Sequence, residues 1–498
     1  MLLNNLIYPV RHTNENSKLP FSDYILVYGA FVLLVVSVYY MSPFISKITV
    51  ILICILFFIT KKDYVWIALF FLIVTRPGNI FAGSGAFNDV QRLPLFTLTR
   101  GFSFSTDDIF LLATLAKSFT IRKKYRLLLI KPIQLLFFFV VILLVVSALF
   151  FNAKITTLVD FLRILFFYSL LYSFPRLICD SNNLRKFFYL LFPSIIFIFY
   201  TSIYFFVTGK YFVYLFSINT LRNVNLETGT NTERMGIYGG GHILILLCFI
   251  FALVYSIRNL GIRKYYLIVI ATLAFVSIFL TATRVWFIVY SFIFSYFAFK
   301  VGRGVILTGV LFFFVFYSLL GISRQTSSGL INTWERIASV FTIGQKNSLA
   351  TESIDYKIKS DFTRIWQGIK ESPVLGWGFS NRYITEGSAD IGNWNLIFQV
   401  GFLGFFFFIY FWLSYLGLIL KTNSWIKEKL YRKELGIIMV GFIGLLIAQF
   451  TTHQIFGFNI HPYDHYFLSV YIISTEFFVR ESRNAYTEFL NLRKFTNA

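Results

Sequence analysis

Long apolar stretches recur along the chain, separated mostly by short polar connections. A transmembrane helix needs about 20 predominantly apolar residues. Fourteen stretches approach that length and predict helices over residues 22–40, 44–60, 63–75, 106–119, 131–151, 158–174, 186–207, 236–256, 265–282, 285–299, 304–321, 395–420, 435–452 and 463–479. The third, fourth and tenth are short enough to be re-entrant or partly embedded. The pattern predicts an all-α polytopic integral membrane protein with about 12–14 transmembrane helices.

Positive charges in the connections predict the orientation of the chain. Short cytoplasmic loops of membrane proteins collect Lys and Arg. With the N-terminus in the cytoplasm, the inner connections and tails hold 26 Lys and Arg residues, whereas the short outer connections hold Lys47, Lys154 and Arg284. We therefore expect both termini to be cytoplasmic.

The composition excludes a soluble globular protein. Of 498 residues, 57% are hydrophobic, 20% are aromatic and only 14% are charged, against about a quarter charged in soluble domains. The net charge of +22 would indicate a nucleic-acid partner in a soluble protein. Here the basic residues lie between apolar stretches, so we expect membrane lipids and no nucleic acid as partners.

The polar segments divide the chain into three parts. Residues 1–321 hold the N-terminal transmembrane helices with outer loops 76–105 and 208–235, and residues 395–498 hold the C-terminal helices and a cytoplasmic tail. Between them, residues 322–394 form the longest polar stretch, which we expect to be a large helical extracytoplasmic loop. Apolar residues at helical spacing in SIDYKIKSDFTRIWQGIKESP predict one or two helices over the mouth of the bundle. Structureless loops of this length are uncommon, which favours a functional loop.

Arginines dominate the candidate chemistry. The chain has no Walker loop, no GxSxG and no HExxH, and its three cysteines are far apart, so no cofactor and no metal site is predicted. Arginine forks suit a phosphate or diphosphate group. The arginines that map to the outer face are Arg76, Arg100, Arg222, Arg234, Arg284, Arg324, Arg336, Arg364 and Arg382.

Two of these arginines stand at helix boundaries. Arg284 lies between two apolar helices with almost no loop, where a charge is costly unless it is paired or used; the alternative is an arginine that reaches a lipid phosphate at the interface. Arg234 precedes the glycines 239–241, which would let a ligand approach the backbone, or would serve only helix packing. His242 follows them and either lines a cavity or is an interior histidine.

Four pieces of sequence, taken in order, resemble a known family. They are Arg234-Met-Gly236 near a helix start, Thr281-Ala-Thr-Arg284 after a helix, the outer loop with Arg364 and ESPVLGWGFS, and NWNLIFQVGFLG entering a helix. Together they resemble the O-antigen polymerase and ligase superfamily of bacterial glycan assembly, over about residues 230–420. Each piece is short, and their order and placement give the resemblance its specificity.

The resemblance implies an inverting, metal-independent glycosyltransferase at the outer face of the bacterial inner membrane. Its donor and acceptor would be glycans on undecaprenyl diphosphate, and a chain-length regulator would be a further partner. In the family, arginines at the positions of Arg234 and Arg284 are thought to engage the diphosphate or the reacting sugar. The ligase branch has a His eleven residues before the Gly matching Gly401; here that residue is Asp390, which favours a polymerase.

Other polar and aromatic residues compete for roles in such a site. Asp390 is our candidate general base, although an Asp also suits a helix N-cap. His453 and His461 lie with Asp464 and His465 in one short outer connection, as substrate contacts or simply as solvated residues. The outer-loop tryptophans, which suit either sugar stacking or an interfacial aromatic belt, are Trp366, Trp377 and Trp394.

Two other functions remain open at this stage. One is the O-antigen ligase. The other is a flippase or transporter of lipid-linked oligosaccharides, which would also have many helices and a cationic cavity. Transporters usually show internal repeats and charges near the membrane midplane, whereas this sequence shows no repeat and has most of its charges outside the apolar stretches.

Overall fold

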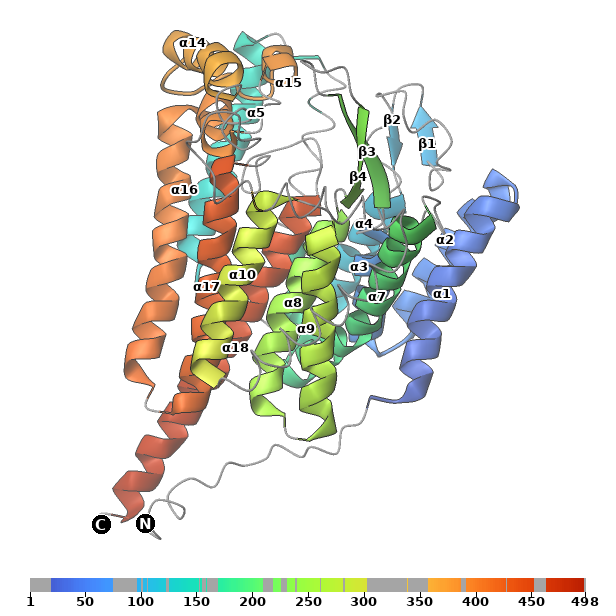
Figure 1. Cartoon of the computed structure of the whole chain (residues 1–498), viewed down its shortest axis with the longest axis vertical. Coiled ribbons are helices and arrows are strands. Elements are labelled where there is room, and N and C mark those ends of the chain that lie inside the picture. Colours follow the sequence, from blue (N-terminus) through green and yellow to red (C-terminus); the bar gives the residue numbers. More distant parts are fainter. Residues whose placement is uncertain are drawn as a thin grey trace.

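The computed structural model of the chain is a bundle of helices (Figure 1). It describes residues 19–74, 96–99, 102–104, 106–121, 125–151, 153–154, 158, 169–208, 218–224, 231–237, 240–259, 261–280, 283–301, 338, 357–386, 391–426, 428–451 and 463–496.

The bundle helices follow the apolar stretches. They are α1 (Phe21–Tyr40), α2 (Pro43–Ile59), α3 (Asp63–Val74), α4 (Thr106–Thr120), α5 (Ile130–Phe150), α7 (Ser181–Thr208), α8 (Gly240–Arg258), α9 (Ile262–Leu280), α10 (Arg284–Val301), α16 (Gly392–Trp425), α17 (Lys429–Thr451) and α18 (Tyr463–Thr496). Residues 169–178 are helical as well. Within the described residues, six helices are long and apolar enough to cross a membrane, and four shorter apolar helices accompany them. The prediction of a helical polytopic membrane protein is thereby confirmed. The helix expected over 304–321 lies outside the described residues.

Two antiparallel hairpins, which the sequence did not predict, accompany the helices. One pairs β1 (Phe96–Thr99) with β2 (Phe102–Phe104), and the other pairs β3 (Ile218–Val224) with β4 (Asn231–Ile237). Within the expected loop 322–394, the described residues form η3 (Lys357–Phe362), α14 (Thr363–Glu371), α15 (Asn381–Glu386) and the start of α16. The all-α description therefore holds for the bundle, and the segments outside it add short strands.

Helices α3 and α8 occupy the centre of the bundle. From Leu244 to Tyr255, every side chain of α8 is at most 3% exposed. A helix that is apolar on all sides is expected to be buried on all sides. Its neighbours are α7, α9, α10, α17 and α18. Aromatic rings fill the contacts: Phe251 stacks on Phe188 with ring centroids 4.1 Å apart and on Phe478 at 6.0 Å.

Peripheral helices turn apolar side chains outward. Phe44 on α2, Leu149 on α5 and Phe406 on α16 are 70%, 69% and 62% exposed. Contiguous apolar surface of this kind would be unstable in water, and lipid is its natural solvent.

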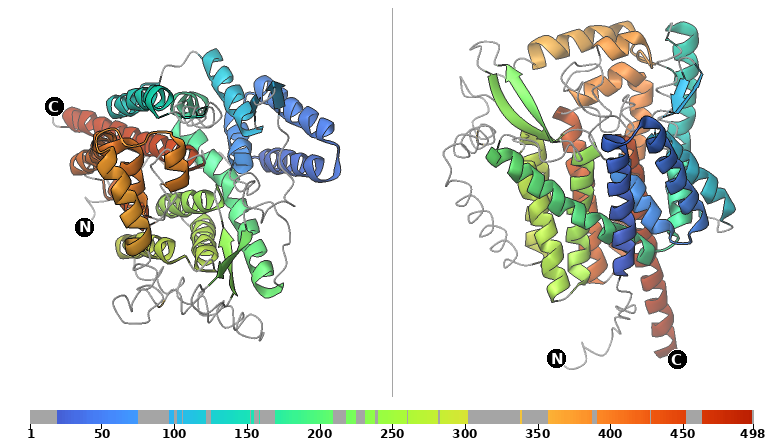
Figure 2. Two further views of the ribbon diagram at one scale, coloured as in Figure 1. Left: turned by 90° about the horizontal axis from the view of Figure 1, so that it is seen from above. Right: turned by 90° about the vertical axis from the view of Figure 1, so that its right-hand side faces the viewer.

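The two ends of the bundle differ. Both hairpins, α14 and α15 lie at one end, whereas α1 begins and α18 ends at the other (Figure 1). We call these the loop end and the tail end. Helix α14 lies crosswise over the loop end (Figure 2). The described parts of the three segments predicted to be outside thus share one end, opposite the start of α1 and the end of α18; that the tail end faces the cytoplasm remains a prediction.

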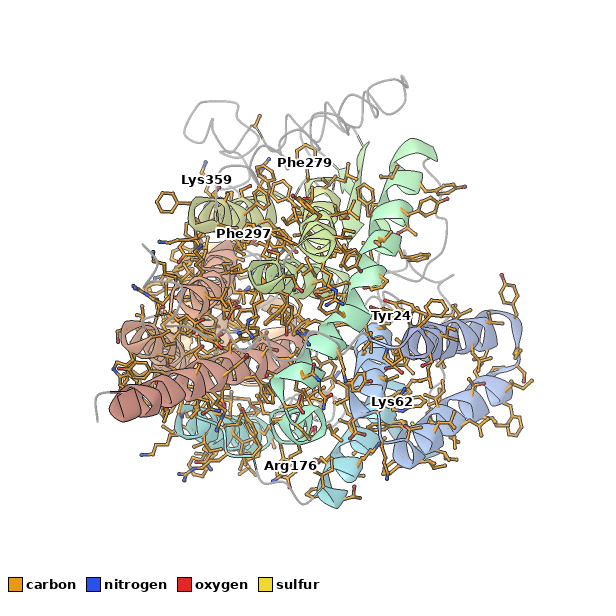
Figure 3. All side chains as sticks on the ribbon, turned by 90° about the horizontal axis from the view of Figure 1, so that it is seen from below. Tyr24, Lys62, Arg176, Phe279, Phe297 and Lys359 are labelled. Atoms are coloured by element: carbon orange, nitrogen blue, oxygen red, sulfur yellow. The ribbon has the colours of Figure 1, made fainter. Side chains whose placement is uncertain are left out.

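Ion pairs to the buried carboxylates of Asp23 and Glu434 tie the helices together near the tail end. Lys62 Nζ, immediately before α3, lies 2.5 Å from Asp23 Oδ1 of α1, on the side of the bundle across from Phe279 and Phe297 (Figure 3). Arg258 at the end of α8 pairs with Glu434 of α17 and, at 2.5 Å, with Glu481 of α18. Such pairs satisfy charges that would otherwise be buried alone.

Candidate functional site

The predicted site residues fall into three groups. The side chains of Arg284, Arg364 and Trp394 are described. For Arg222, Arg234 and His242 the structure gives the backbone position alone. The candidates that lie outside the described residues are Arg76, Asp390, His453 and His461.

The β3–β4 hairpin carries two of the candidate arginines. In its register Arg222 lies opposite Glu233, and Arg234 lies opposite Leu221. Residues directly opposite each other share a face of a sheet, and successive residues alternate between the faces. Arg222 and Arg234 therefore belong to opposite faces of the hairpin.

Arg284 is the first residue of α10 and is partly buried. The helix starts with a hydrogen bond from the Phe287 N–H to the Thr283 carbonyl oxygen at 3.0 Å. Helix α10 starts at the loop end, as does α8 after β4 (Figure 1). The positive ends of both helix dipoles and Arg284 therefore lie toward the end that carries the hairpins and α14.

The segment between α14 and α15 binds directly to α16. The Trp377 and Gly378 N–H groups donate to the carbonyl oxygens of Phe398 and Gln399, at 2.9 and 2.7 Å. In return, the Phe402 N–H donates to the Pro373 carbonyl oxygen at 2.8 Å. These bonds join ESPVLGWGFS to NWNLIFQVGFLG, so two of the four pieces that carry the family resemblance form one unit.

A break in α16 makes this contact possible. Gly401 has φ 65° and ψ −179°, a conformation that is essentially restricted to glycine. The break frees the carbonyl groups of the preceding turn, which then accept the bonds from Trp377 and Gly378. A Cβ on Gly401 would lie 2.1 Å from the Val374 carbonyl oxygen, and one on Gly376 would lie 2.5 Å from that of Gln399. Both glycines are required by close backbone approach.

An aromatic cluster lies beside this contact. Phe362, Trp366 of α14 and Trp394 of α16 have ring centroids 5.0 to 5.9 Å apart. The Trp394 side chain is 36% exposed and Trp366 is partly buried. Flat aromatic faces of this kind can stack on the apolar face of a sugar ring.

Trp377 has a different environment from the other two tryptophans. Its indole N–H donates to the Gly368 carbonyl oxygen at 2.8 Å. The Arg382 guanidinium lies 4.1 Å from the centre of its ring, and Phe151 at the end of α5 contacts it at 5.6 Å. Because these contacts already engage Trp377, its role is to hold the loop together, and Trp366 and Trp394 are the better candidates for stacking.

The two described loop arginines are bound unequally. Arg382 pairs with Glu371 and, at 3.1 Å, with Glu386. The hydrogen bond from Arg382 holds the pKa of Glu371 below its ordinary value. Arg364 is 44% exposed, and its pair with Asp361 has a long N–O distance of 3.5 Å. Of these two arginines, Arg364 is the more available to an anionic ligand.

Buried amides in the first turns of α16 escaped the sequence analysis. Asn393, Asn395 and Gln399 are buried, and Asn393 Oδ1 accepts no hydrogen bond from the described residues. Asn395 and Gln399 are four residues apart and share a helix face. The signal for them in the sequence is NWNLIFQVGFLG, in which three amides interrupt an apolar run. Side-chain amides can both donate to and accept from sugar hydroxyls.

No family model and no curated protein matches this chain. Within the described residues, no three His, Cys, Asp or Glu side chains are grouped so as to hold a metal ion. The loop end combines an exposed arginine, two partly exposed tryptophans and buried amides around a fixed backbone contact, and is therefore the candidate site.

Proposed function

We propose that this protein is a membrane glycosyltransferase that polymerises oligosaccharide repeats carried on undecaprenyl diphosphate, at the outer face of a bacterial inner membrane. The product would be a surface polysaccharide such as an O-antigen or a capsule. The observation that carries the proposal is the contact of residues 373–378 with residues 398–402, because it joins two distant pieces of the family resemblance at the loop end.

The reaction demands little more than positioning and charge stabilisation. A hydroxyl oxygen of the acceptor glycan attacks the anomeric carbon of the donor, the bond to the lipid diphosphate breaks, and the hydroxyl proton passes to a base. Because diphosphate is a good leaving group, the protein needs only to stabilise the negative charge of the diphosphate and to orient the acceptor hydroxyl. In the proposal, Arg234 and Arg284 serve the diphosphate, Asp390 accepts the proton, and Arg222, Arg364, Trp394 and the α16 amides contact glycan.

Other candidates from the sequence have a supporting place in the proposal. Arg76, His242, His453 and His461 would line the route by which the lipid-linked substrates approach. No metal ion or cofactor takes part in the proposed reaction.

The position of the helix break favours an enzyme over a transporter. Transporters place broken helices and binding sites near the membrane midplane. Here residues 402–425 follow the break, and at 1.5 Å per residue they alone form a helix of about 36 Å, enough to cross the hydrocarbon core. In the proposal, Gly401 and the amides before it therefore lie at the membrane surface.

A gene-deletion strain provides the test, with surface glycan resolved on a gel and lipid-linked intermediates extracted in parallel. Single repeats on the surface acceptor would support a polymerase. Long chains held on the lipid carrier would instead indicate a ligase, and repeats retained on the cytoplasmic leaflet would indicate a flippase.

Complementation of that strain tests the arginines. We expect Arg234→Ala and Arg284→Ala each to abolish chain extension while folded protein remains in the membrane, because one lost charge contact to a developing anion costs about 10²-fold or more in rate. Lys300→Ala, at the opposite end of α10, is the control and should restore long chains. Normal chains with either arginine variant would refute its role.

A further inference from the structure

We propose that Arg480 and Arg483 bind a phosphate group at the tail end of the bundle, and that its source is the headgroup of an anionic phospholipid. The inference is independent of the glycosyltransferase proposal, because the site lies at the opposite end of the bundle from α14 and the hairpins.

Three elements bring the two arginines together. They are three residues apart on α18 and so share a helix face. Arg480 donates to the carbonyl oxygen of Arg126, and its guanidinium lies 4.6 Å from the ring of Tyr125. Arg483 Nη2 donates to Thr422 Oγ1 of α16 at 3.2 Å. The pair thus lies between α18, the end of α16 and the segment before α5.

The pair retains capacity to bind an anion. The Nε–H groups of both arginines are buried and have no hydrogen-bond acceptor within the described residues. The nearby carboxylate of Glu476 is already occupied, because its two oxygens accept the N–H groups of Leu128 and Leu129 at 2.9 and 3.0 Å. Two guanidiniums beside one occupied carboxylate leave a positive site with unused donors in a forked geometry that matches phosphate.

The guanidiniums of Arg480 and Arg483 repel each other in the absence of a bound anion. Burial, and then the charge of Arg480, lower the pKa of Arg483. Like charges at this spacing on a helix are destabilising. A bound anion would offset that repulsion.

The position beside the end of α16 indicates a lipid as the source of the phosphate. Arg483 bonds Thr422 in the last turns of α16, which is one of the six helices long and apolar enough to cross a membrane. Trp425, which is half exposed, lies against both Arg483 and Lys421, at 5.7 and 5.0 Å from its ring centre. Tryptophan at this depth is typical of the headgroup level, where basic pockets between helices bind anionic headgroups.

Lipid binding to the purified full chain tests the site. The protein is prepared in nanodiscs of phosphatidylcholine with or without phosphatidylglycerol, and retained lipid is counted by native mass spectrometry while Tm is recorded. We expect phosphatidylglycerol to be retained and to raise Tm, and the double variant R480Q/R483Q to bind it roughly tenfold more weakly or worse.

A matched control separates a site from general attraction of basic residues to anionic lipid. Lys429 and Arg432 are also three residues apart, are exposed and lie at the tail end, at the start of α17. K429Q/R432Q removes the same charge and should retain phosphatidylglycerol as the unmodified chain does. Equal losses in the two double variants would overturn the proposal.

Two further measurements keep the test decisive. R480K/R483K preserves the charge, so it should fold even if R480Q/R483Q does not, and it should still bind phosphatidylglycerol more weakly because lysine lacks the planar fork. Wild-type binding by R480K/R483K would overturn forked recognition. Inorganic phosphate, added to nanodiscs of phosphatidylcholine alone, should leave Tm unchanged; a rise equal to that from phosphatidylglycerol would refute the lipid source.

Discussion

At the scale of single residues, Gly376 and Gly401 allow the loop to contact α16. Each has a positive φ, and at each a Cβ would collide with backbone atoms rather than with a movable side chain. Backbone cannot yield as a side chain can, so the contact between the loop and α16 depends on the absence of two methyl groups.

We therefore predict that Gly401→Ala destabilises the protein. The strained backbone alone costs about 1–3 kcal/mol, and the collision with Val374 adds to it. Gly417→Ala, farther along α16, is the control: no atom lies within 4 Å of its added Cβ, and replacing a helical glycine stabilises by about 0.5–1 kcal/mol. Thermal unfolding of purified variants should show a lower Tm for G401A and an unchanged or higher one for G417A. Equal Tm values would contradict the proposed contact.

Helices and loops are tied to one another by ion pairs, at the scale of elements. Arg258 joins α8 to α17 and α18 through two carboxylates, and Glu434 is fully buried. At the loop end, Arg382 joins α15 to α14 through Glu371 in partly exposed surroundings. Burial decides the consequence of breaking each pair. Solvent screens the Arg382–Glu371 pair, whereas it hardly reaches the Arg258–Glu434 pair.

For the buried pair we predict a large loss. Arg258→Met leaves Glu434 as an uncompensated buried charge, which costs about 3–5 kcal/mol. The double variant R258M/E434L removes both charges and should recover most of that loss. Chemical denaturation of the three proteins measures the differences in unfolding free energy. A double variant no more stable than R258M would show that the pair does not act as a unit.

For the exposed pair we predict a pH effect. The pKa of Glu371 is lowered by Arg382, so the pair stabilises the loop above the ordinary Glu pKa of about 4.3 and this contribution is lost as pH falls through the lowered pKa. Hydrogen exchange over residues 363–386 should therefore accelerate, relative to the rest of the chain, when neutral buffer is replaced by acid. Glu371→Gln should already exchange faster at neutral pH and should respond less to acid. An identical response in both proteins would contradict the role of the pair.

At the scale of the whole molecule, the two ends of the bundle differ. The hairpins and crosswise helices lie at one end, and α18 ends at the other (Figures 1 and 2). The distribution of Lys and Arg in the sequence predicts that the second end is cytoplasmic. A cysteine placed at each end makes that orientation measurable.

In a chain whose three native cysteines are replaced, we expect Val374→Cys to react with a membrane-impermeant maleimide in intact cells. Val374 is 60% exposed beside α14. Lys429→Cys, exposed at the start of α17, should react only after the membrane is permeabilised. The reverse pattern would place the termini outside the cytoplasm.

The helices of the bundle could be predicted because their cause is local. A run of apolar residues forms a helix in lipid wherever it lies in the chain. The predicted bounds of α1 (22–40) and α2 (44–60) are therefore within one residue of the observed bounds. Other bounds differ by more: α17 begins at Lys429 against a predicted 435, α16 ends at Trp425 against 420, and α18, which is predicted to end at residue 479, runs to Thr496. Hydropathy detects where the apolar stretch ends, whereas hydrogen bonding lets the helix continue into water.

The sequence by itself determined the solvent of the protein and its helical class. Only the tertiary structure decided which residues meet. It showed that ESPVLGWGFS binds the broken start of α16, that Trp377 is held internally whereas Trp394 is exposed, and that Arg222 and Arg234 belong to opposite faces of a hairpin. Apolar periodicity is a property of neighbours in the chain, whereas these contacts join residues brought together by backbone geometry and packing, which no local pattern encodes.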